Sequence, residues 1–155
     1  MKTIDEGAQA PDFELPDEEG RPVRLSERLA EGPVVLFFYP AALTGGCTKE
    51  ACHFRDLAGE FAAVGAQRLG ISVDPVERQK EFADTHHFDY PLLSDESGAV
   101  ATSFGVRRRF LSPVKRATFV IDRDRTVRKV ITSEVSMDVH ADKALEALAA
   151  LPSTS

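Results

Sequence analysis

The sequence predicts an α/β fold in which helices cover both faces of a central mixed β-sheet. The runs "VVLFFY" (34–39) and "RLGISVD" (68–74) are continuously apolar, as strands covered on both faces are. Segments with helical periodicity alternate with these runs, which favours helices packed against a sheet. The turn "RDR" (123–125) joins two late strands and adds an antiparallel pair to the sheet.

Length and composition are those of one ordinary domain. The chain has 155 residues, 43% of them apolar, and we expect a single domain over 1–155 with frayed tails at 1–8 and 152–155. The net charge of −6 argues against a nucleic-acid partner. The first residues contain no apolar secretion signal, and the longest apolar run (34–43) is too short for a bilayer. We therefore expect a protein that does not enter the membrane and is located in the cytoplasm. In the cytoplasm thiols stay reduced.

The N-terminal half begins with a hairpin. Residues 13–15 and 22–25 are short extended runs separated by "PDEEGR", a turn-forming segment. Ser26 is predicted to cap a short helix over 26–31. The buried strand 34–39 follows, and ligands of such sheets gather beyond the carboxyl ends of central strands.

The rest of the chain alternates helices with strands. The predicted elements are a helix at 47–64, the strand 68–74, a helix at 76–86, an extended piece at 90–95, a short helix at 98–106, strands at 117–122 and 126–134, and a final helix at 140–151. In that last helix Ala141, Leu145 and Leu148 share one apolar face.

Both cysteines of the chain, Cys47 and Cys52, lie in the predicted helix 47–64. At 100° per residue its apolar residues form one stripe that must face the core, made of Phe54, Leu57, Ala58, Phe61 and Val64. Cys47 extends that stripe in the first turn, where the helix dipole favours a thiolate, whereas Cys52 projects toward solvent. The flexible Thr44-Gly45-Gly46 loop lets backbone amides approach a ligand. Cys47 is thus placed as a nucleophile.

Glu50 lies on the same inward stripe, one turn after Cys47. An inward carboxylate is costly unless a cation pairs with it. Arg116, just before the strand 117–122, is the best-placed cation, while Arg107 to Arg109 compete from a loop-like stretch. The sequence therefore predicts an arginine from elsewhere in the fold beside Glu50.

The five-residue spacing of the cysteines constrains any bond between them. In an intact helix their Cα atoms would lie roughly 8.6 Å apart. A disulfide needs Cα atoms within about 7 Å. A Cys47–Cys52 bond therefore requires local unwinding, which suits a reaction cycle better than a permanent staple.

These residues resemble a known family. "PAALTGGC" (40–47) fits the P-x-x-x-T-x-x-C signature of peroxiredoxins, and "TGGCTKEAC" (44–52) resembles the Q-type subgroup, the bacterioferritin comigratory proteins. The likeness extends over nearly the whole chain and includes "APDFELPDEEG", "GISVDPVERQKEFA", "YPLLSD" and "RATFVID". It implies a thioredoxin-like fold and a thiol-dependent peroxidase acting on hydrogen peroxide and organic hydroperoxides.

The resemblance also implies roles for individual residues. Cys47 would be the peroxidatic cysteine and Cys52 the resolving one, joined in an intramolecular disulfide that thioredoxin or a similar dithiol reduces. The supporting residues would be Thr44 and Arg116 at the reacting atoms, with Pro40, Gly46 and Glu50 around them. Gly46 departs from the subgroup, which usually has proline there, and the unusual stretch 105–116 leaves Arg107 to Arg109 without a role. Q-type relatives favour a monomer over a dimer.

The sequence leaves two other functions open. The cysteines could serve a general thiol–disulfide oxidoreductase, although no C-x-x-C is present, or a redox-sensing or metal-binding module without turnover. The cysteine spacing is not that of a zinc site, and the sequence shows neither a phosphate loop nor a dinucleotide fingerprint. We accordingly expect no metal and no cofactor.

Overall fold

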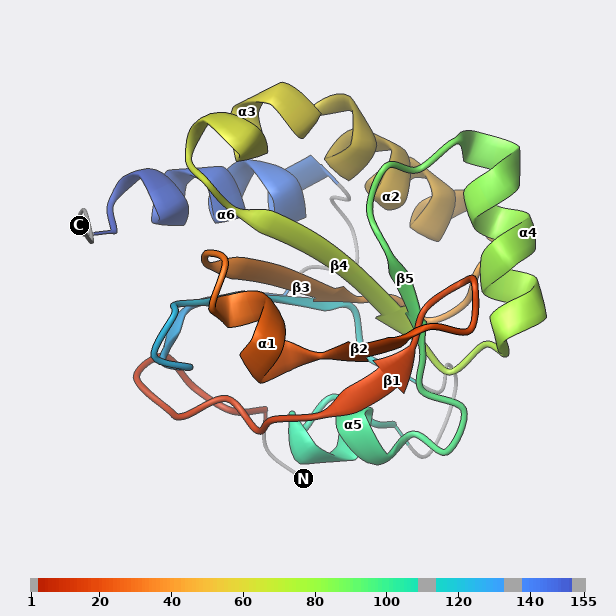
Figure 1. The fold of residues 1–155 in the computed structure, drawn as a ribbon, viewed down its shortest axis with the longest axis horizontal. Coiled ribbons are helices and arrows are strands. Elements are labelled where there is room, and N and C mark those ends of the chain that lie inside the picture. The colour runs from red at the N-terminus through yellow and green to blue at the C-terminus, as the bar shows by residue number, and fades with distance from the viewer. Residues whose placement is uncertain (1–2, 109–113, 133–137, 152–155) are drawn as a thin grey trace.

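The computed structural model describes residues 3–108, 114–132 and 138–151. They form three layers, with a β-sheet in the middle and helices on each side of it (Figure 1). The sheet has the strand order β5-β4-β3-β6-β7. Its strands are β3 (Val34–Phe38), β4 (Gln67–Ser72), β5 (Leu92–Ser94), β6 (Ala117–Ile121) and β7 (Val127–Thr132). The β3–β4 and β4–β5 pairs are parallel, whereas β6 runs antiparallel to β3 and β7. The predicted mixed sheet is confirmed.

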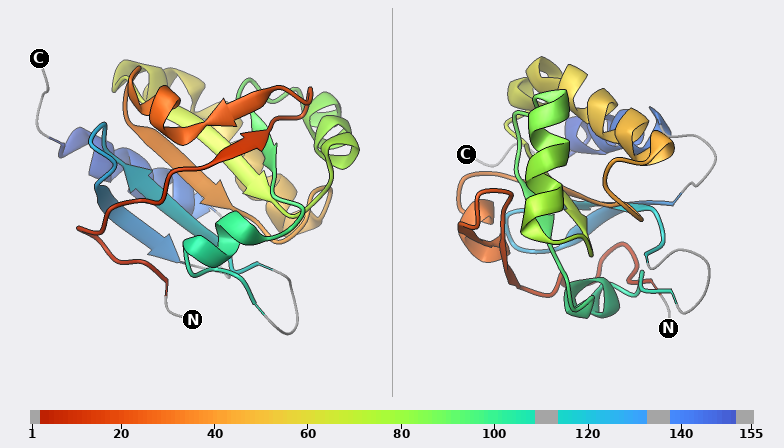
Figure 2. Two further views of the ribbon diagram at one scale, coloured as in Figure 1. Left: turned by 60° about the horizontal axis from the view of Figure 1, so that its bottom comes forward. Right: turned by 90° about the vertical axis from the view of Figure 1, so that its right-hand side faces the viewer.

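Helices cover both faces of this sheet, as the two views of Figure 2 show. One face carries α2 (Gly45–Asp56), α3 (Ala58–Ala63), α4 (Val76–His86) and α6 (Asp138–Ala149). The opposite face carries α1 (Leu25–Leu29), α5 (Ala99–Ser103) and the antiparallel hairpin of β1 (Glu14–Pro16) and β2 (Pro22–Arg24). The predicted N-terminal hairpin is therefore present.

The central strand β3 divides the core into two apolar clusters. Val34, Leu36 and Phe38 face the cluster beneath α1 and α5, because successive side chains of a strand alternate between faces. Val35, Phe37 and the following Tyr39 face the cluster beneath the other helices. All six are fully buried, as the continuous apolar run predicted.

The predicted helix 47–64 differs from the structure in two ways. It begins earlier, at Gly45, and it breaks at Leu57 into α2 and α3. The break changes the direction of the apolar stripe, so that Phe54 and Phe61 are buried but Val64 is 37% exposed. The prediction that Val64 faces the core is wrong because one continuous helix was assumed.

Ser26 does not cap α1, and that prediction is wrong as well. The helix begins at Leu25, and its N-cap residue Arg24 makes no side-chain capping bond. Both the amide and the hydroxyl of Ser26 donate instead to Asp12, at 2.9 Å each. This carboxylate ties the start of α1 to the segment that precedes the hairpin.

Residues 3–8 are bound to the body of the domain. The Ile4 amide donates to the Phe104 carbonyl and the Gly7 amide to the Val127 carbonyl. This part of the predicted tail is held by backbone hydrogen bonds, while 1–2 and 152–155 lie outside the described residues.

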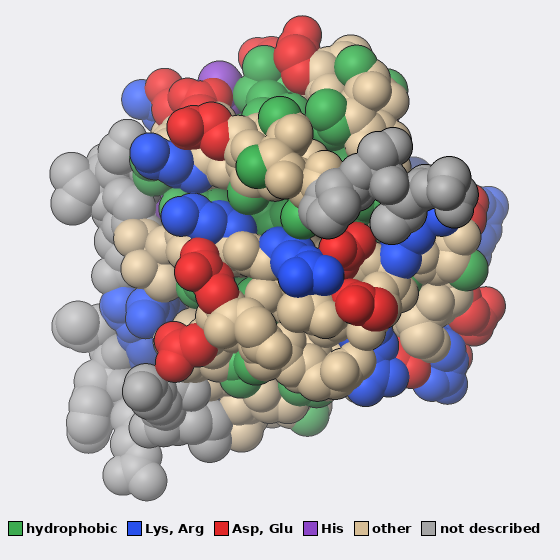
Figure 3. All heavy atoms as spheres, turned by 90° about the vertical axis from the view of Figure 1, so that its left-hand side faces the viewer, with side chains coloured by type: hydrophobic (Ala, Val, Ile, Leu, Met, Phe, Trp, Pro, Cys, Tyr) green, Lys and Arg blue, Asp and Glu red, His purple; other side chains and the backbone are tan. Residues whose placement is uncertain are grey.

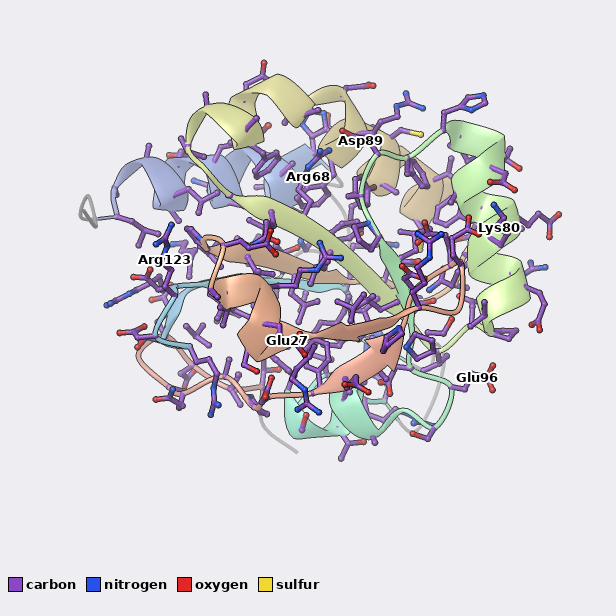
Figure 4. The ribbon with its side chains drawn as sticks, viewed as in Figure 1. Glu27, Arg68, Lys80, Asp89, Glu96 and Arg123 are labelled. Atoms are coloured by element: carbon purple, nitrogen blue, oxygen red, sulfur yellow. The ribbon has the colours of Figure 1, made fainter. Side chains whose placement is uncertain are left out.

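The surface carries both acidic and basic side chains. Acidic and basic groups are interspersed on the face shown in Figure 3. Arg68 of β4 pairs with Asp89 through two hydrogen bonds of 3.0 and 2.8 Å (Figure 4). Within the described residues, no helix is long and apolar enough to cross a bilayer.

Candidate active site

Strand register brings Arg116 to the carboxyl end of β3. Phe38, the last residue of β3, is paired with Ala117, the first residue of the antiparallel β6. Arg116 directly precedes Ala117, so it lies at the edge of the sheet where β3 ends and the loop to α2 begins. Residues 69 positions apart in the chain, Cys47 and Arg116, are thereby placed side by side.

Cys47 is the third residue of α2, whose N-cap residue is Thr44. The Thr48 amide donates to the Thr44 carbonyl at 2.8 Å and closes the first turn. The amides of the three residues before Thr48 have no acceptor within the helix, and the positive end of the helix dipole lies here. The Cys47 side chain is only 1% exposed, although Thr44, Gly45 and Gly46 are exposed. The thiol is therefore buried at a site that favours negative charge.

Arg116 contacts both Cys47 and Glu50. Its Nη2 donates to Cys47 Sγ at 3.3 Å, and its Nη1 donates to Glu50 Oε1 at 2.8 Å. Arg116 is 7% exposed and Glu50 is fully buried. The predicted contact between Glu50 and an arginine from elsewhere in the fold is present, and the arginine is Arg116.

Burial decides the protonation of Glu50. It raises the pKa of Glu50 to about 8, although the charge and hydrogen bond of Arg116 act in the opposite direction. Burial alone would lower the pKa of Arg116, but the neighbouring Glu50 and Cys47 raise it above its ordinary value. Near neutral pH, Glu50 is thus mostly a neutral acceptor for a charged guanidinium.

His140 of α6 completes the group from the far side of Glu50. Its Nδ1 lies 3.5 Å from Glu50 Oε2 and is hydrogen bonded to Thr118 Oγ1 at 2.7 Å. Glu50 Oε2 itself makes no hydrogen bond to any of the described residues. We call Cys47, Glu50, Arg116, Thr118 and His140 the Arg116 cluster.

Thr44 and Pro40 belong to the loop between β3 and α2. The Thr44 hydroxyl donates to the Ala41 carbonyl at 2.8 Å, so the loop is closed by a hydrogen bond within itself. Pro40 follows the buried Tyr39 and is half-buried, whereas Gly46 is exposed in the first turn of α2. Thr44, Pro40 and Gly46 therefore lie on the chain segment that leads into Cys47.

Cys52 lies apart from this cluster, in the middle of α2. Both thiols are free, and Cys52 is half-buried where Cys47 is buried. Burial raises the pKa of the Cys52 thiol, an effect that the charge of Arg55 reduces. The next residue, His53, contacts Asp142 of α6 at 2.9 Å. The two cysteines are inequivalent, as helix geometry predicted.

Sequence reasoning missed three polar residues around the site. Thr118 and His140 were missed because each is a single polar residue among apolar ones, on β6 and on the buried face of α6. Asp74, whose carboxylate accepts from the Ala42 amide at 2.7 Å, was taken only as the end of a strand. A polar residue on an apolar face was the available signal for His140.

The remaining predictions concern arginines and metals. Arg107 Nη1 donates to the Ser97 carbonyl at 3.0 Å, away from Cys47, and Arg109 lies outside the described residues. In the part of the chain that the structure describes, no three His, Cys, Asp or Glu side chains are grouped as metal ligands.

Residues 7–130 of the chain match the model of the AhpC/TSA family. The chain is 40% identical over 149 residues to a chloroplastic peroxiredoxin Q of Sedum lineare, a match that covers 96% of this chain and 80% of the relative.

Two solved structures resemble this one closely. The peroxidoxin BcpB of Mycobacterium tuberculosis superposes with a TM-score of 0.92 at 64% identity, over 96% of this chain and 98% of that one. The bacterioferritin comigratory protein of Xanthomonas campestris, described for its alkyl peroxide reduction activity, superposes with a TM-score of 0.85 at 30% identity, over 94% and 98% of the two chains. The thioredoxin-like fold expected from the sequence is thereby confirmed.

Proposed function

Because the chain belongs to the AhpC/TSA family, and within it to the Q-type peroxiredoxins that act as thiol-dependent peroxidases, we propose a complete catalytic cycle for its two cysteines. The Cys47 thiolate attacks the terminal oxygen of a hydroperoxide. An S–O bond forms, the O–O bond breaks, and Cys47 becomes a sulfenic acid while an alkoxide or hydroxide leaves and takes up a proton. Hydrogen peroxide and organic hydroperoxides are the substrates.

The Arg116 contact with Cys47 Sγ carries this proposal. A guanidinium at 3.3 Å stabilises the thiolate and remains available to the negative charge that moves onto the leaving oxygen. Glu50 supports this role because its raised pKa keeps it largely neutral, so that it orients Arg116 without cancelling the positive charge. Free backbone amides at the start of α2 supply further donors.

Thr44 serves the peroxide as an acceptor. Its hydroxyl hydrogen is already donated to the Ala41 carbonyl, which leaves its lone pairs for the O–H of a bound hydroperoxide. Pro40 and Gly46 shape the approach to the thiol from the exposed side of the loop. Thr44 and Arg116 would together orient the O–O bond in line with the sulfur.

Cys52 reacts with the oxidised Cys47 in the second step of the cycle. Its thiol condenses with the Cys47 sulfenic acid, a water molecule leaves, and an intramolecular disulfide forms after the first turns of α2 unwind. A dithiol protein of the thioredoxin type reduces this disulfide by thiol–disulfide exchange and becomes oxidised itself. Both thiols come from one helix, so a monomer can complete the cycle. A cytoplasmic location is part of the proposal, because each turnover consumes a reduced dithiol.

A mass measurement tests the cycle. One equivalent of peroxide should remove two hydrogens from reduced wild-type protein and link Cys47 to Cys52. In Cys52→Ser the oxidation should stop at a sulfenic acid, which a sulfenic-acid-specific nucleophile traps, and Cys47→Ser should lose peroxide turnover. Full turnover in Cys47→Ser would refute the assignment, and insulin reduction without peroxide would favour a general disulfide reductase instead.

A further inference from the structure

A second buried polar cluster lies beside the active site, at the carboxyl ends of β3 and β4. The Tyr39 hydroxyl donates to Gln79 Oε1 at 2.5 Å. Gln79 Nε2 donates to Ser72 Oγ at 2.9 Å and to the Leu93 carbonyl at 2.7 Å, and Ser72 Oγ donates to Asp74 Oδ2 at 2.6 Å. We call Tyr39, Ser72, Asp74 and Gln79 the Gln79 cluster.

Asp74 extends this cluster to the loop that precedes α2. The Ala42 amide donates to Asp74 Oδ2 at 2.7 Å. A hydrogen bond to a charged carboxylate is stronger than one between neutral groups. The other oxygen, Oδ1, lies 3.8 Å from Arg78 Nε, on the first turn of α4. The loop is therefore tied to β4 and α4 through a single carboxylate.

The tied loop is strained at the next residue. Leu43 has a φ of 65°, a left-handed conformation that leucine rarely adopts. Such a residue persists only where its surroundings hold it. Here the Asp74 bond holds Ala42 on one side, and the Thr44 hydroxyl holds the Ala41 carbonyl on the other.

The loop conformation also fixes where α2 begins. The Thr44 carbonyl accepts the Thr48 amide and so starts the helix in which Cys47 is the third residue. The contact between Cys47 and Arg116 is made with this first turn in the helical form. Disulfide formation with Cys52 needs the same turn to unwind.

We propose that Asp74 is a positioning residue that holds the loop 40–44, and through it the first turn of α2, in the helical form that reacts with peroxide. The inference rests on the proposed peroxidase cycle. Loss of the Asp74 bond releases the strain at Leu43 and favours the unwound form. Asp74 would thus speed sulfenic acid formation and slow disulfide formation, two effects of opposite sign at one residue.

The test compares Asp74→Asn with Asp84→Asn, which makes the same charge change at an exposed position of α4, where Asp84 accepts a hydrogen bond from Lys80. The peroxide step is measured in a Cys52→Ser background, and disulfide formation in the chain with both cysteines, each by rapid quenching and mass spectrometry. In Asp74→Asn the peroxide step should slow, whereas the disulfide should form up to about tenfold faster because a charge-assisted hydrogen bond is weakened. Less Cys47 should reach the sulfinic acid under excess peroxide, and Asp84→Asn should match the wild type.

Opposite changes in the two rates, of the peroxide step and of disulfide formation, distinguish a positioning role of Asp74 from a general loss of structure. Rates unchanged in Asp74→Asn, or both slowed by one factor, would overturn the inference. If Asp74→Asn does not fold, Ser72→Ala is the second variant, since it removes the hydroxyl that donates to Asp74 and keeps the bond from Ala42. Ser72→Ala should shift both rates in the same directions by smaller factors. Unshifted rates in Ser72→Ala would also overturn the inference. A wild type that peroxide does not oxidise would overturn the proposed function as well, whereas a normally cycling wild type beside an unaffected variant would overturn the inference alone.

Discussion

The Arg116 cluster includes residues of α2 itself, and the Gln79 cluster contacts the loop that leads into α2. The two clusters differ in charge and in how far their polar atoms are hydrogen bonded. The Arg116 cluster buries a cation, a carboxyl group and a thiol, and it leaves Glu50 Oε2 without a hydrogen bond among the described residues. In the Gln79 cluster, the buried hydroxyls and the amide of Tyr39, Ser72 and Gln79 all have partners. Only its last member, Asp74, is charged.

This difference indicates a division of labour. Buried groups with unmatched charge or hydrogen-bonding capacity cost stability, and proteins retain them where they serve chemistry. Completely hydrogen-bonded networks rigidify the structure around them. The first cluster would therefore react with peroxide, and the second would fix the backbone that presents the thiol to it.

The largest effect is expected from Arg116→Met in the Arg116 cluster. The substitution removes the donor to Cys47 Sγ and leaves Glu50 without its cation. The rate constant of the peroxide step should fall by about 100- to 1000-fold, the usual loss when a donor to developing charge is removed. The measurement uses the Cys52→Ser background and follows sulfenic acid with time.

Arg128→Met is the matched control, since Arg128 pairs with Asp122 at a partly exposed position on β7. It should leave the peroxide step unchanged. Arg116→Lys keeps the charge but loses the forked geometry that contacts Glu50 and Cys47 together, so it should recover only part of the rate. A loss of less than about tenfold in Arg116→Met would contradict the importance of this donor.

The second prediction concerns pH and Glu50. The pKa of Glu50 is about 8 in the folded protein and 4.5 ordinarily, so between these values the native state keeps a proton that the unfolded state loses. The contribution of Glu50 to the free energy of unfolding is therefore present in full below pH 4.5 and is lost as the pH rises through about 8. Glu50→Gln should remove this slope, which amounts to several kcal/mol between the two ends.

Urea unfolding at several pH values measures that slope. Glu60→Gln, at an exposed position on α3, should retain the wild-type slope. The prediction fails if Glu50→Gln and wild type lose stability in parallel between pH 4.5 and about 8. This outcome would mean that Glu50 is ionised beside Arg116.

Tyr39→Phe tests the Gln79 cluster by the same measurement. The substitution removes the hydroxyl that donates to the buried Gln79 Oε1, and an unmatched buried acceptor costs about 1–3 kcal/mol. Burial raises the pKa of Tyr39 far above its ordinary value, so the hydroxyl stays neutral and the loss should be constant from pH 5 to about 8. A pH-dependent loss would show that the two clusters are electrostatically coupled and do not act separately.

The sequence predicted the framework and one of these clusters in part. Continuous apolar runs identified β3, β4 and β6, and the inward position of Glu50 required a cation because a buried carboxylate is costly alone. The break at Leu57 could not be predicted, since the apolar period continues through it. His140 and the Gln79 cluster were missed because their decisive hydrogen bonds are long-range: Thr118 and His140 are 22 positions apart, and Tyr39 and Gln79 are 40 positions apart. Only the folded chain brings these residues together.

The smallest effect should come from Gly45→Ala, which acts on the helix turn that both clusters hold. Gly45 is the first residue of α2, and a Cβ there meets no atom within 4 Å. Alanine restricts the unfolded chain and should stabilise the protein by about 0.5–1 kcal/mol. Because disulfide formation requires this turn to unwind, its rate should fall by about two- to fivefold.

Gly59→Ala provides a control with the same chemistry, since Gly59 also lies in a helix, α3, and also has open space at its Cβ. It should raise the free energy of unfolding by a similar amount, measured in urea, and leave the rate of disulfide formation unchanged. Equal slowing in both variants would assign the effect to global stability. Slowing in Gly45→Ala alone would show that unwinding of the first turn of α2 limits disulfide formation. Arg116 contacts Cys47 in this turn, and Asp74 would hold the turn in its helical form.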